Sequence, residues 1–186
     1  MKKKTVKILV LIDCQNDFIT GALRNEDAIK AVPRIVEKVN SFDGDAIFGT
    51  MDCHSDDYLG TREGMKLPVK HCIFGTEGYI IHPDIMEAVK SAEKRGVFSK
   101  FITKETFGTL VLQQFIKRQY PSEELDIEVV GFVSSICVIT NALILKTSFY
   151  DRADISISRS CTAGLNGYNN EAALEVARSC QIEIRD

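Results

Sequence analysis

Short runs rich in β-branched and apolar residues alternate with longer helical patterns along this 186-residue chain. Such alternation is the signature of βαβ units, in which helices connect the parallel strands of one sheet. The first run, residues 6–12, is apolar almost throughout, which is typical of a central strand that helices cover on both faces. We therefore predict an α/β fold. Its strands are expected at residues 6–12, 45–50, 96–101, 127–132, 154–158 and 181–184.

Helical periodicity separates these runs. One apolar stripe with three- and four-residue spacing comprises Ile29, Val32, Ile35, Val39 and Phe42. Pro33 lies inside this stripe, so the helix must either begin near it or be kinked there. Further helices are predicted at residues 109–120, 134–149 and 169–180.

Residues 52–83 interrupt this rhythm. They show little periodicity, and they contain several glycines and all three histidines of the chain. A loop of this length inside a compact domain usually serves a function. Since we find no internal repeat, low-complexity stretch or linker, we expect residues 1–186 to form one domain.

The charge balance argues against a nucleic-acid partner. The chain has 23 basic and 26 acidic residues, a net charge of −3, whereas nucleic-acid-binding faces usually cluster lysine and arginine. The one basic run, Lys2, Lys3, Lys4 and Lys7, is expected to be a solvated end. No apolar segment has the length of a signal-peptide core or of a membrane span. We therefore expect a soluble, cytoplasmic protein with no membrane partner.

One of the six cysteines stands where a nucleophile would be useful. Disulfide frameworks belong mostly to short secreted chains, so we expect six free thiols. Parallel sheets bind ligands beyond the carboxyl ends of their strands, and Cys137 lies just after a predicted strand, near the start of a helix. Unpaired amides and the helix dipole there favour a thiolate and could hold an oxyanion. A buried, inert thiol is the alternative.

Two charged residues end neighbouring runs. Asp13 ends the most apolar strand, where a carboxylate is costly unless it is paired or hydrogen-bonded. Lys100 ends the run at residues 96–101, and the two could compensate each other's burial. With Cys137 they would form an activated nucleophile, in which the carboxylate takes the thiol proton and the ammonium holds charge and geometry. A structural ion pair is the alternative.

Ordered motifs at these positions resemble the isochorismatase-like cysteine hydrolase superfamily, from about residue 6 to the end. The motifs are Val10-Leu-Ile-Asp-Cys-Gln-Asn-Asp-Phe18, then Lys100, then Gly131-x5-Cys137-Val followed by Asn141-Ala142. Many members have Thr-Asp where this chain has Ser134-Ser135, a departure that bears on a supporting carboxylate and not on the nucleophile.

The resemblance implies a three-layer α/β/α fold whose six-stranded parallel sheet has the order 3-2-1-4-5-6. It also implies that Asp13, Lys100 and Cys137 are the catalytic residues. A cis peptide bond would fall at Phe132–Val133, and the amides of Val133 and Cys137 would form the oxyanion hole. Self-association into a homo-oligomer is a further implication.

The long loop contains residues suited to a metal. Asp52 and His54 flank Cys53, and the alternation of an extended strand points both of them to one face. With His71 they offer one carboxylate and two imidazoles, a set that suits Zn²⁺ first and also Mn²⁺ or Fe²⁺. The arrangement looks like that of nicotinamidases, in which the metal binds a pyridine nitrogen. In some members of that group, the residue at the position of Glu63 is a further ligand.

Other interpretations of the histidines stay open. They could be solvated or capping residues, or Cys53, His54, His71 and Cys72 could form a structural zinc knot. Alternation argues against the knot, because adjacent residues of an extended strand face opposite ways. His82, which precedes Pro83, is expected to be structural.

The predicted function is a metal-assisted cysteine amidohydrolase of nicotinamidase type. It would convert nicotinamide and water to nicotinate and ammonia through a thioester. Phe18 and Phe107 are expected to wall the pocket of a flat, small-molecule amide substrate, although either could belong to the core, and Tyr79 and Phe101 are weaker candidates. The alternatives are a related hydrolase of another small amide, an N-carbamoyl compound or isochorismate, and a non-catalytic metal- or thiol-binding protein.

Overall fold

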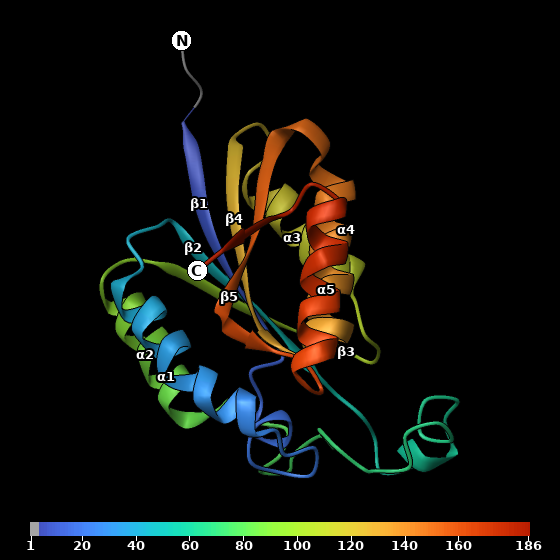
Figure 1. The fold of residues 1–186 in the computed structure, drawn as a ribbon. Coiled ribbons are helices and arrows are strands. Elements are labelled where there is room, and N and C mark those ends of the chain that lie inside the picture. Colours follow the sequence, from blue (N-terminus) through green and yellow to red (C-terminus); the bar gives the residue numbers. More distant parts are fainter. Residues whose placement is uncertain (1–3) are drawn as a thin grey trace.

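The computed structural model describes residues 4–186, and its centre is a six-stranded parallel sheet (Figure 1). Neighbouring strands follow the order β3-β2-β1-β4-β5-β6, and each of these pairs is parallel. The α/β class and the strand order predicted from the sequence are therefore confirmed. The strands are β1 (Thr5–Ile12), β2 (Ala46–Asp52), β3 (Phe98–Lys104), β4 (Glu124–Phe132), β5 (Ala153–Ala163) and β6 (Glu183–Arg185).

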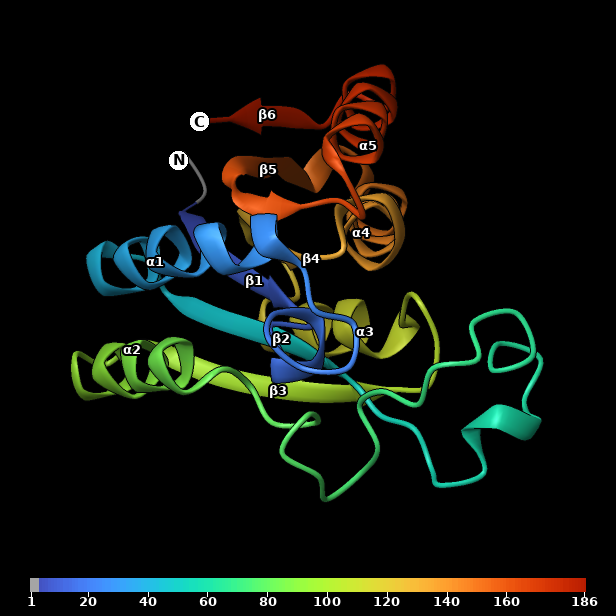
Figure 2. The ribbon, with the colours of Figure 1, turned by 60° about the horizontal axis from the view of Figure 1, so that its bottom comes forward.

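Helices cover both faces of this sheet (Figure 2). The first layer consists of α1 (Glu26–Ser41) and α2 (Pro83–Lys94), and its buried residues form one hydrophobic core with one face of the sheet. The second layer consists of α3 (Leu110–Gln119), α4 (Ile139–Phe149) and α5 (Gly167–Ser179), which enclose a separate core on the opposite face.

The central strand β1 explains why its sequence is apolar almost throughout. Leu9 and Leu11 belong to the core under α1 and α2, whereas Ile8, Val10 and Ile12 belong to the core on the other face. All five side chains are buried. Burial on both faces requires an apolar residue at every position, so the usual polar alternation of a half-exposed strand disappears.

Two helix starts differ from the sequence prediction, and one helix was not predicted. Helix α1 begins at Glu26, well before Pro33, because the side chain of Asn25 accepts hydrogen bonds from the amides of Asp27 and Ala28. Helix α5 begins at Gly167 in the same way, after the cap Asn166. Helix α2 was not predicted. Its signals were Pro83 at the first position and a buried stripe of Ile85, Ala88, Val89 and Ala92.

The basic N-terminal run and the cysteines are placed as the sequence predicts, in so far as the structure describes them. Lys4 and Lys7 form exposed ion pairs with Asp45 and Asp43, while Lys2 and Lys3 lie outside the described residues. All six cysteines are free. Among residues 4–186, no helix combines the length and apolarity that a membrane crossing requires.

Gly131 allows β4 to pass close beside β1 at the edge where the site forms. Its φ is +113°, and a Cβ atom there would stand 2.1 Å from the backbone oxygen of Ile12. We expect Gly131→Ala to lower the free energy of unfolding by about 2–3 kcal/mol, measured by urea denaturation. The control is Gly167→Ala, since a Cβ at Gly167 meets nothing within 4 Å. Equal stability of the two variants would contradict the constraint at Gly131.

Candidate active site

The sulfur of Cys137 lies at the carboxyl end of β4, as expected. The chain leaves β4 at Phe132 through a cis peptide bond to Val133 and then forms a π-helical turn at Ser134–Val138. The amides of Ile136 and Val138 both donate to the carbonyl of Val133, at 3.0 and 3.2 Å. This turn holds the thiol in place, and single π-turns of this kind often occur at functional sites.

A buried lysine connects the sulfur of Cys137 to two carboxylates. The Nζ atom of Lys104 lies 2.7 Å from Asp13 Oδ2 and 3.1 Å from Asp52 Oδ1. It also lies 3.7 Å from the sulfur of Cys137. Lys104 is the last residue of β3 and is in register with Asp52, the last residue of β2. The ends of neighbouring strands thus bring the four side chains together.

The expected place of Lys100 beside Asp13 and Cys137 is wrong. Lys100 is in register with Phe48 in the middle of β2, and its exposed side chain lies over the ring of Phe115. Two pleats separate it from Lys104, about 13 Å along an extended strand. The error came from ending the strand at Phe101. The β-branched pair Ile102-Thr103 was the signal that the strand continues to Lys104.

Asp13 is positioned and polarised by its neighbours. Its backbone turns out of β1 with φ of +46°, and its Oδ1 atom accepts a hydrogen bond of 2.6 Å from the hydroxyl of Thr50. Burial raises the pKa of Asp13. The positive charge of Lys104 opposes this increase, whereas the negative charge of Asp52 adds to it, so the pKa of Asp13 is raised overall. A carboxylate with a raised pKa is suited to accept a proton.

The thiol of Cys137 carries its proton in this environment. Burial, followed by the negative charge of Asp13, raises the pKa of Cys137 well above its ordinary value, and Lys104 lowers it only in part. Asp13 is also a hydrogen-bond partner of the thiol. The sequence argument for a ready-made thiolate at a helix start therefore does not describe this site. The geometry instead favours transfer of the proton to Asp13 as the sulfur attacks.

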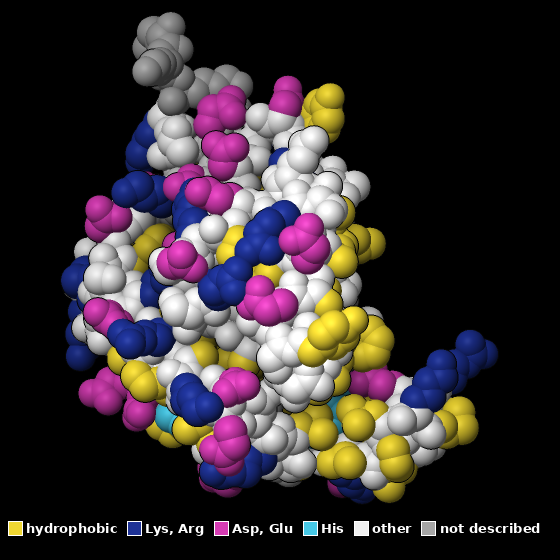
Figure 3. Space-filling model, in the orientation of Figure 1, with side chains coloured by type: hydrophobic (Ala, Val, Ile, Leu, Met, Phe, Trp, Pro, Cys, Tyr) yellow, Lys and Arg dark blue, Asp and Glu magenta, His cyan; other side chains and the backbone are white. Residues whose placement is uncertain are grey.

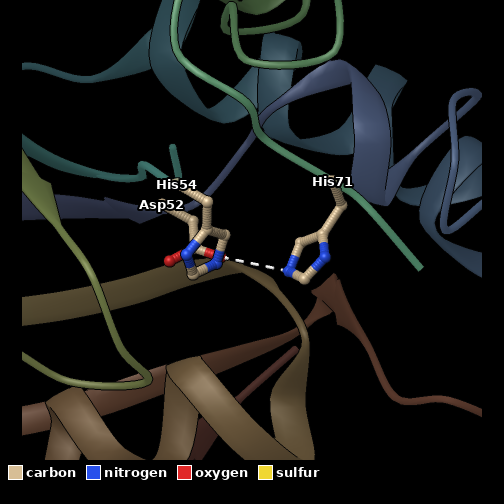
Figure 4. Close-up of side chains that lie close together, drawn as sticks. All are labelled: Asp52, His54 and His71. Carbon is tan, nitrogen blue, oxygen red and sulfur yellow. Dashed lines mark hydrogen bonds and ion pairs between the residues drawn. The ribbon is translucent and has the colours of Figure 1, made fainter. Parts of the chain in front are cut away.

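Asp52, His54 and His71 form the predicted cluster of metal ligands (Figure 4). Asp52 Oδ2 lies 3.0 Å from His54 Nε2 and 3.4 Å from His71 Nε2. All three side chains are buried, and one ligand atom from each lies within 4.8 Å of the others. Within the described residues, no other group of three or more such side chains is placed to hold a metal, so the zinc knot with Cys53 and Cys72 does not form.

The hydrogen bonding of these residues suits a cation. The Nδ1 atom of His71 lies 2.9 Å from the carbonyl oxygen of Val69, and because a carbonyl only accepts, Nδ1 must carry a proton. In neutral His71 the lone pair of Nε2 then points toward the Asp52 carboxylate, so either a proton on Nε2 or a cation must lie between these two acceptors. A divalent metal would be such a cation.

The pKa shifts indicate the same demand for positive charge. Burial would raise the pKa of Asp52, but the hydrogen bonds from both histidines and the charge of Lys104 outweigh it, so the net pKa is lowered. Burial would lower the pKa of His71, yet its hydrogen bond to Asp52 raises it. Glu63 lies nearby, with Oε1 3.9 Å from His54 Nε2, but it is not part of the three-residue cluster.

A cavity of about 790 Å³ opens onto both groups of residues. Its lining includes Cys137 and Val133 together with Asp52, Glu63 and His71, and both expected aromatic residues, Phe18 and Phe107, also line it. Neither Tyr79 nor Phe101 lines it. Sequence reasoning missed Thr50, Lys104 and Tyr58; the buried ring of Tyr58 packs against both metal-site imidazoles, with centroid distances of 4.6 and 4.9 Å.

The segment that carries Glu63 projects from the body of the molecule, and hydrophobic side chains gather over it and around its base (Figure 3). Its large exposed apolar residues include Leu59, Met65, Leu67, Val69 and Phe74. This long segment therefore does what its length suggested, since it supplies part of the cavity wall and two of the histidines.

The isochorismatase domain model matches residues 7–186. The chain belongs to the isochorismatase family, and it is a hydrolase. A nicotinamidase/pyrazinamidase from Mycobacterium tuberculosis is 27% identical over 189 residues, which cover 96% of this chain and 98% of that protein.

Solved structures share the fold. A nicotinamidase/pyrazinamidase from Bacillus subtilis superposes with a TM-score of 0.81 at 22% identity, covering 98% of this chain and 100% of its own. A pyrazinamidase from Pyrococcus horikoshii, in complex with zinc, has a TM-score of 0.74 at 25% identity, covering 96% and 97%. The predicted membership of this superfamily, with nicotinamidases as near relatives, is confirmed.

The two lysines of β3 provide a matched test of the geometry. Lys104→Met leaves Asp13 and Asp52 without their shared counter-charge, so we expect a loss of about 3–5 kcal/mol in the free energy of unfolding. Lys100→Met removes an exposed charge and should change it by less than about 0.5 kcal/mol. Urea denaturation at neutral pH measures both. Similar losses in the two variants would contradict the assignment of Lys104.

The metal cluster can be tested without an activity assay. We expect the wild-type protein to bind one equivalent of Zn²⁺ in equilibrium dialysis, and His71→Ala to lose that binding because one imidazole ligand is removed. His82→Ala is the control, because this third histidine occupies the N-cap position of α2 without a side-chain capping hydrogen bond and is not part of the cluster. Retained stoichiometric binding by His71→Ala would exclude His71 as a ligand.

Proposed function

We propose that the protein is a metal-assisted amidase of the nicotinamidase type, which hydrolyses nicotinamide to nicotinate and ammonia. One observation carries this proposal. The thiol of Cys137 and two members of the Asp52-His54-His71 cluster, Asp52 and His71, line one cavity, and the ammonium of Lys104 contacts both Cys137 and Asp52. A cysteine and a metal site this close can act on opposite ends of one small molecule.

The covalent half of the reaction belongs to Cys137 and Asp13. As the sulfur attacks the amide carbon, the thiol proton passes to the Asp13 carboxylate, which its raised pKa prepares for that role. Protonated Asp13 then gives this proton to the departing nitrogen, so that ammonia leaves and a thioester forms. Asp13 next takes a proton from a water molecule as that water attacks the thioester, and it returns this proton to the departing sulfur, which restores both the thiol and the carboxylate. The acid product then releases its own proton to solvent and leaves as nicotinate.

Lys104 keeps the charges of this sequence in balance. Burial alone would lower the pKa of Lys104, but Asp13, Cys137 and Asp52 raise it above its ordinary value, so the side chain stays an ammonium. It thereby stabilises whichever of Asp13 or the sulfur is negatively charged. The amides of Val133 and Cys137 are the proposed donors to the oxyanion that forms at the substrate carbonyl.

The metal site would hold the other end of the substrate. Asp52, His54 and His71 are the proposed ligands, with Glu63 as a further one, and Zn²⁺ is the first candidate before Mn²⁺ and Fe²⁺. A bound divalent metal supplies a Lewis acid toward a ring nitrogen. Phe18, whose ring meets the edge of His71 at a centroid distance of 5.7 Å, and Phe107 would bound a flat heteroaromatic ring. The named nicotinamidases among the relatives support this substrate class.

Ammonia release tests the proposal directly. We expect the wild-type protein supplied with Zn²⁺ or Mn²⁺ to release ammonia from nicotinamide, and Cys137→Ala to lose at least about 10³-fold in kcat. Asp13→Asn should lose about 10²- to 10⁴-fold, because the proton acceptor is gone. Cys180→Ala is the matched control, since that exposed thiol lies outside the cavity.

Two outcomes would contradict the proposal in different ways. No turnover of nicotinamide with any metal removes this substrate and leaves the family's other chemistry, which N-carbamoyl compounds, other small amides and isochorismate would then probe. Full activity after removal of all metal would instead exclude the role given to Asp52, His54 and His71.

A further inference from the structure

Strand β1 ends before its neighbour β2 does. The last backbone hydrogen bond between them runs from the Asp13 amide to the Thr50 carbonyl, at 3.2 Å, and at Asp13 the chain turns away from the sheet with φ of +46°. Strand β2 continues to Asp52. The backbone of Asp52 therefore has a strand partner on the β3 side but none on the β1 side.

The side chain of Gln15 takes the place of the missing strand. Its Oε1 atom accepts a hydrogen bond of 2.7 Å from the amide of Asp52, and its Nε2 atom donates one of 2.8 Å to the carbonyl of the same residue. A second hydrogen bond from Nε2 reaches the carbonyl of Tyr79 at 2.7 Å. Gln15 is fully buried, so water cannot replace these bonds, and each lost partner would orphan a buried backbone group.

Only a carboxamide of this length meets the requirement. The site needs an acceptor for one amide and two donors for two carbonyls. An ionised glutamate has the right length but no donor, and methionine has neither donor nor a strong acceptor. On the opposite side, Asp52 is in register with Lys104, whose carbonyl accepts from the amide of Cys53 at 2.9 Å. Hydrogen bonds thus hold the backbone at Asp52 on both sides of strand β2.

We propose that Gln15 is a positioning residue for the metal centre, which holds the backbone of Asp52 so that its carboxylate stays between His71, His54 and Lys104. The inference rests on the metal site of the proposed function. Gln15 does not line the cavity, so it acts through Asp52 and not on the substrate. It also ties the long loop, through Tyr79, to the strand ends that carry Asp13 and Asp52.

The experiment compares Zn²⁺ affinity in matched variants, by competition with a chromophoric chelator. We expect Gln15→Met to weaken Zn²⁺ binding about 10- to 100-fold, the range typical when the groups that orient metal ligands are lost. Gln15→Glu keeps the size and the acceptor but loses the donors, and it should weaken binding as well. It also serves as the test where Gln15→Met does not fold.

A destabilised variant far from the metal separates positioning from general loss of structure. Leu174→Ala truncates a buried side chain of α5 and should lower the midpoint of urea denaturation while leaving Zn²⁺ affinity unchanged. Wild-type affinity in both Gln15 variants, or an equal loss in Leu174→Ala, would overturn the role of Gln15. Failure of the wild-type protein to bind Zn²⁺ would overturn both the proposed metal centre and this inference. If the wild-type protein binds Zn²⁺ but releases no ammonia from nicotinamide, the role of Gln15 stands and the nicotinamidase proposal is removed.

Discussion

The buried ammonium of Lys104 is the interaction on which the site depends. Two carboxylates, Asp13 and Asp52, end neighbouring strands at the same edge of the sheet, and both are almost fully buried. Placing two negative charges there without compensation would be very costly. One lysine in contact with both makes their burial tolerable, and its third contact is the sulfur of Cys137. In the proposed mechanism, the same side chain therefore serves both charge compensation and catalysis.

The two carboxylates differ because their other partners differ. Asp13 receives one hydroxyl hydrogen bond in a fully buried place, and its pKa is raised. Asp52 faces two imidazoles in addition to Lys104, and its pKa is lowered. One carboxylate is consequently suited to exchange protons and the other to stay anionic beside a cation. Environments that push apart the pKa values of neighbouring acids are how enzymes assign such roles.

Sheet topology explains why residues so distant in sequence meet. With β1 flanked by β2 and β4, and β3 next to β2, the carboxyl ends of four adjacent strands bring Cys137, Asp13, Asp52 and Lys104 to one edge. The strand order reverses direction at β1, where open α/β sheets characteristically bind their ligands. Because β1 ends short of β2, a side chain, that of Gln15, completes the hydrogen bonding that a backbone would otherwise provide.

Local pattern in the sequence determined the fold class, the central strand, most helices, and the positions of Cys137, Asp13, Asp52 and His54 at or just after strand ends. Each of these follows from periodicity and from the cost of a polar group after an apolar run, both of which are local. Strand length and register are set by pairing between strands, and they decided which lysine faces the site. Lys100 and Lys104 lie on the same face of β3, yet only Lys104 is level with Asp52. Only the tertiary structure could show which lysine lies at the site, because no local feature of a strand determines which residue of the neighbouring strand each of its own residues will pair with.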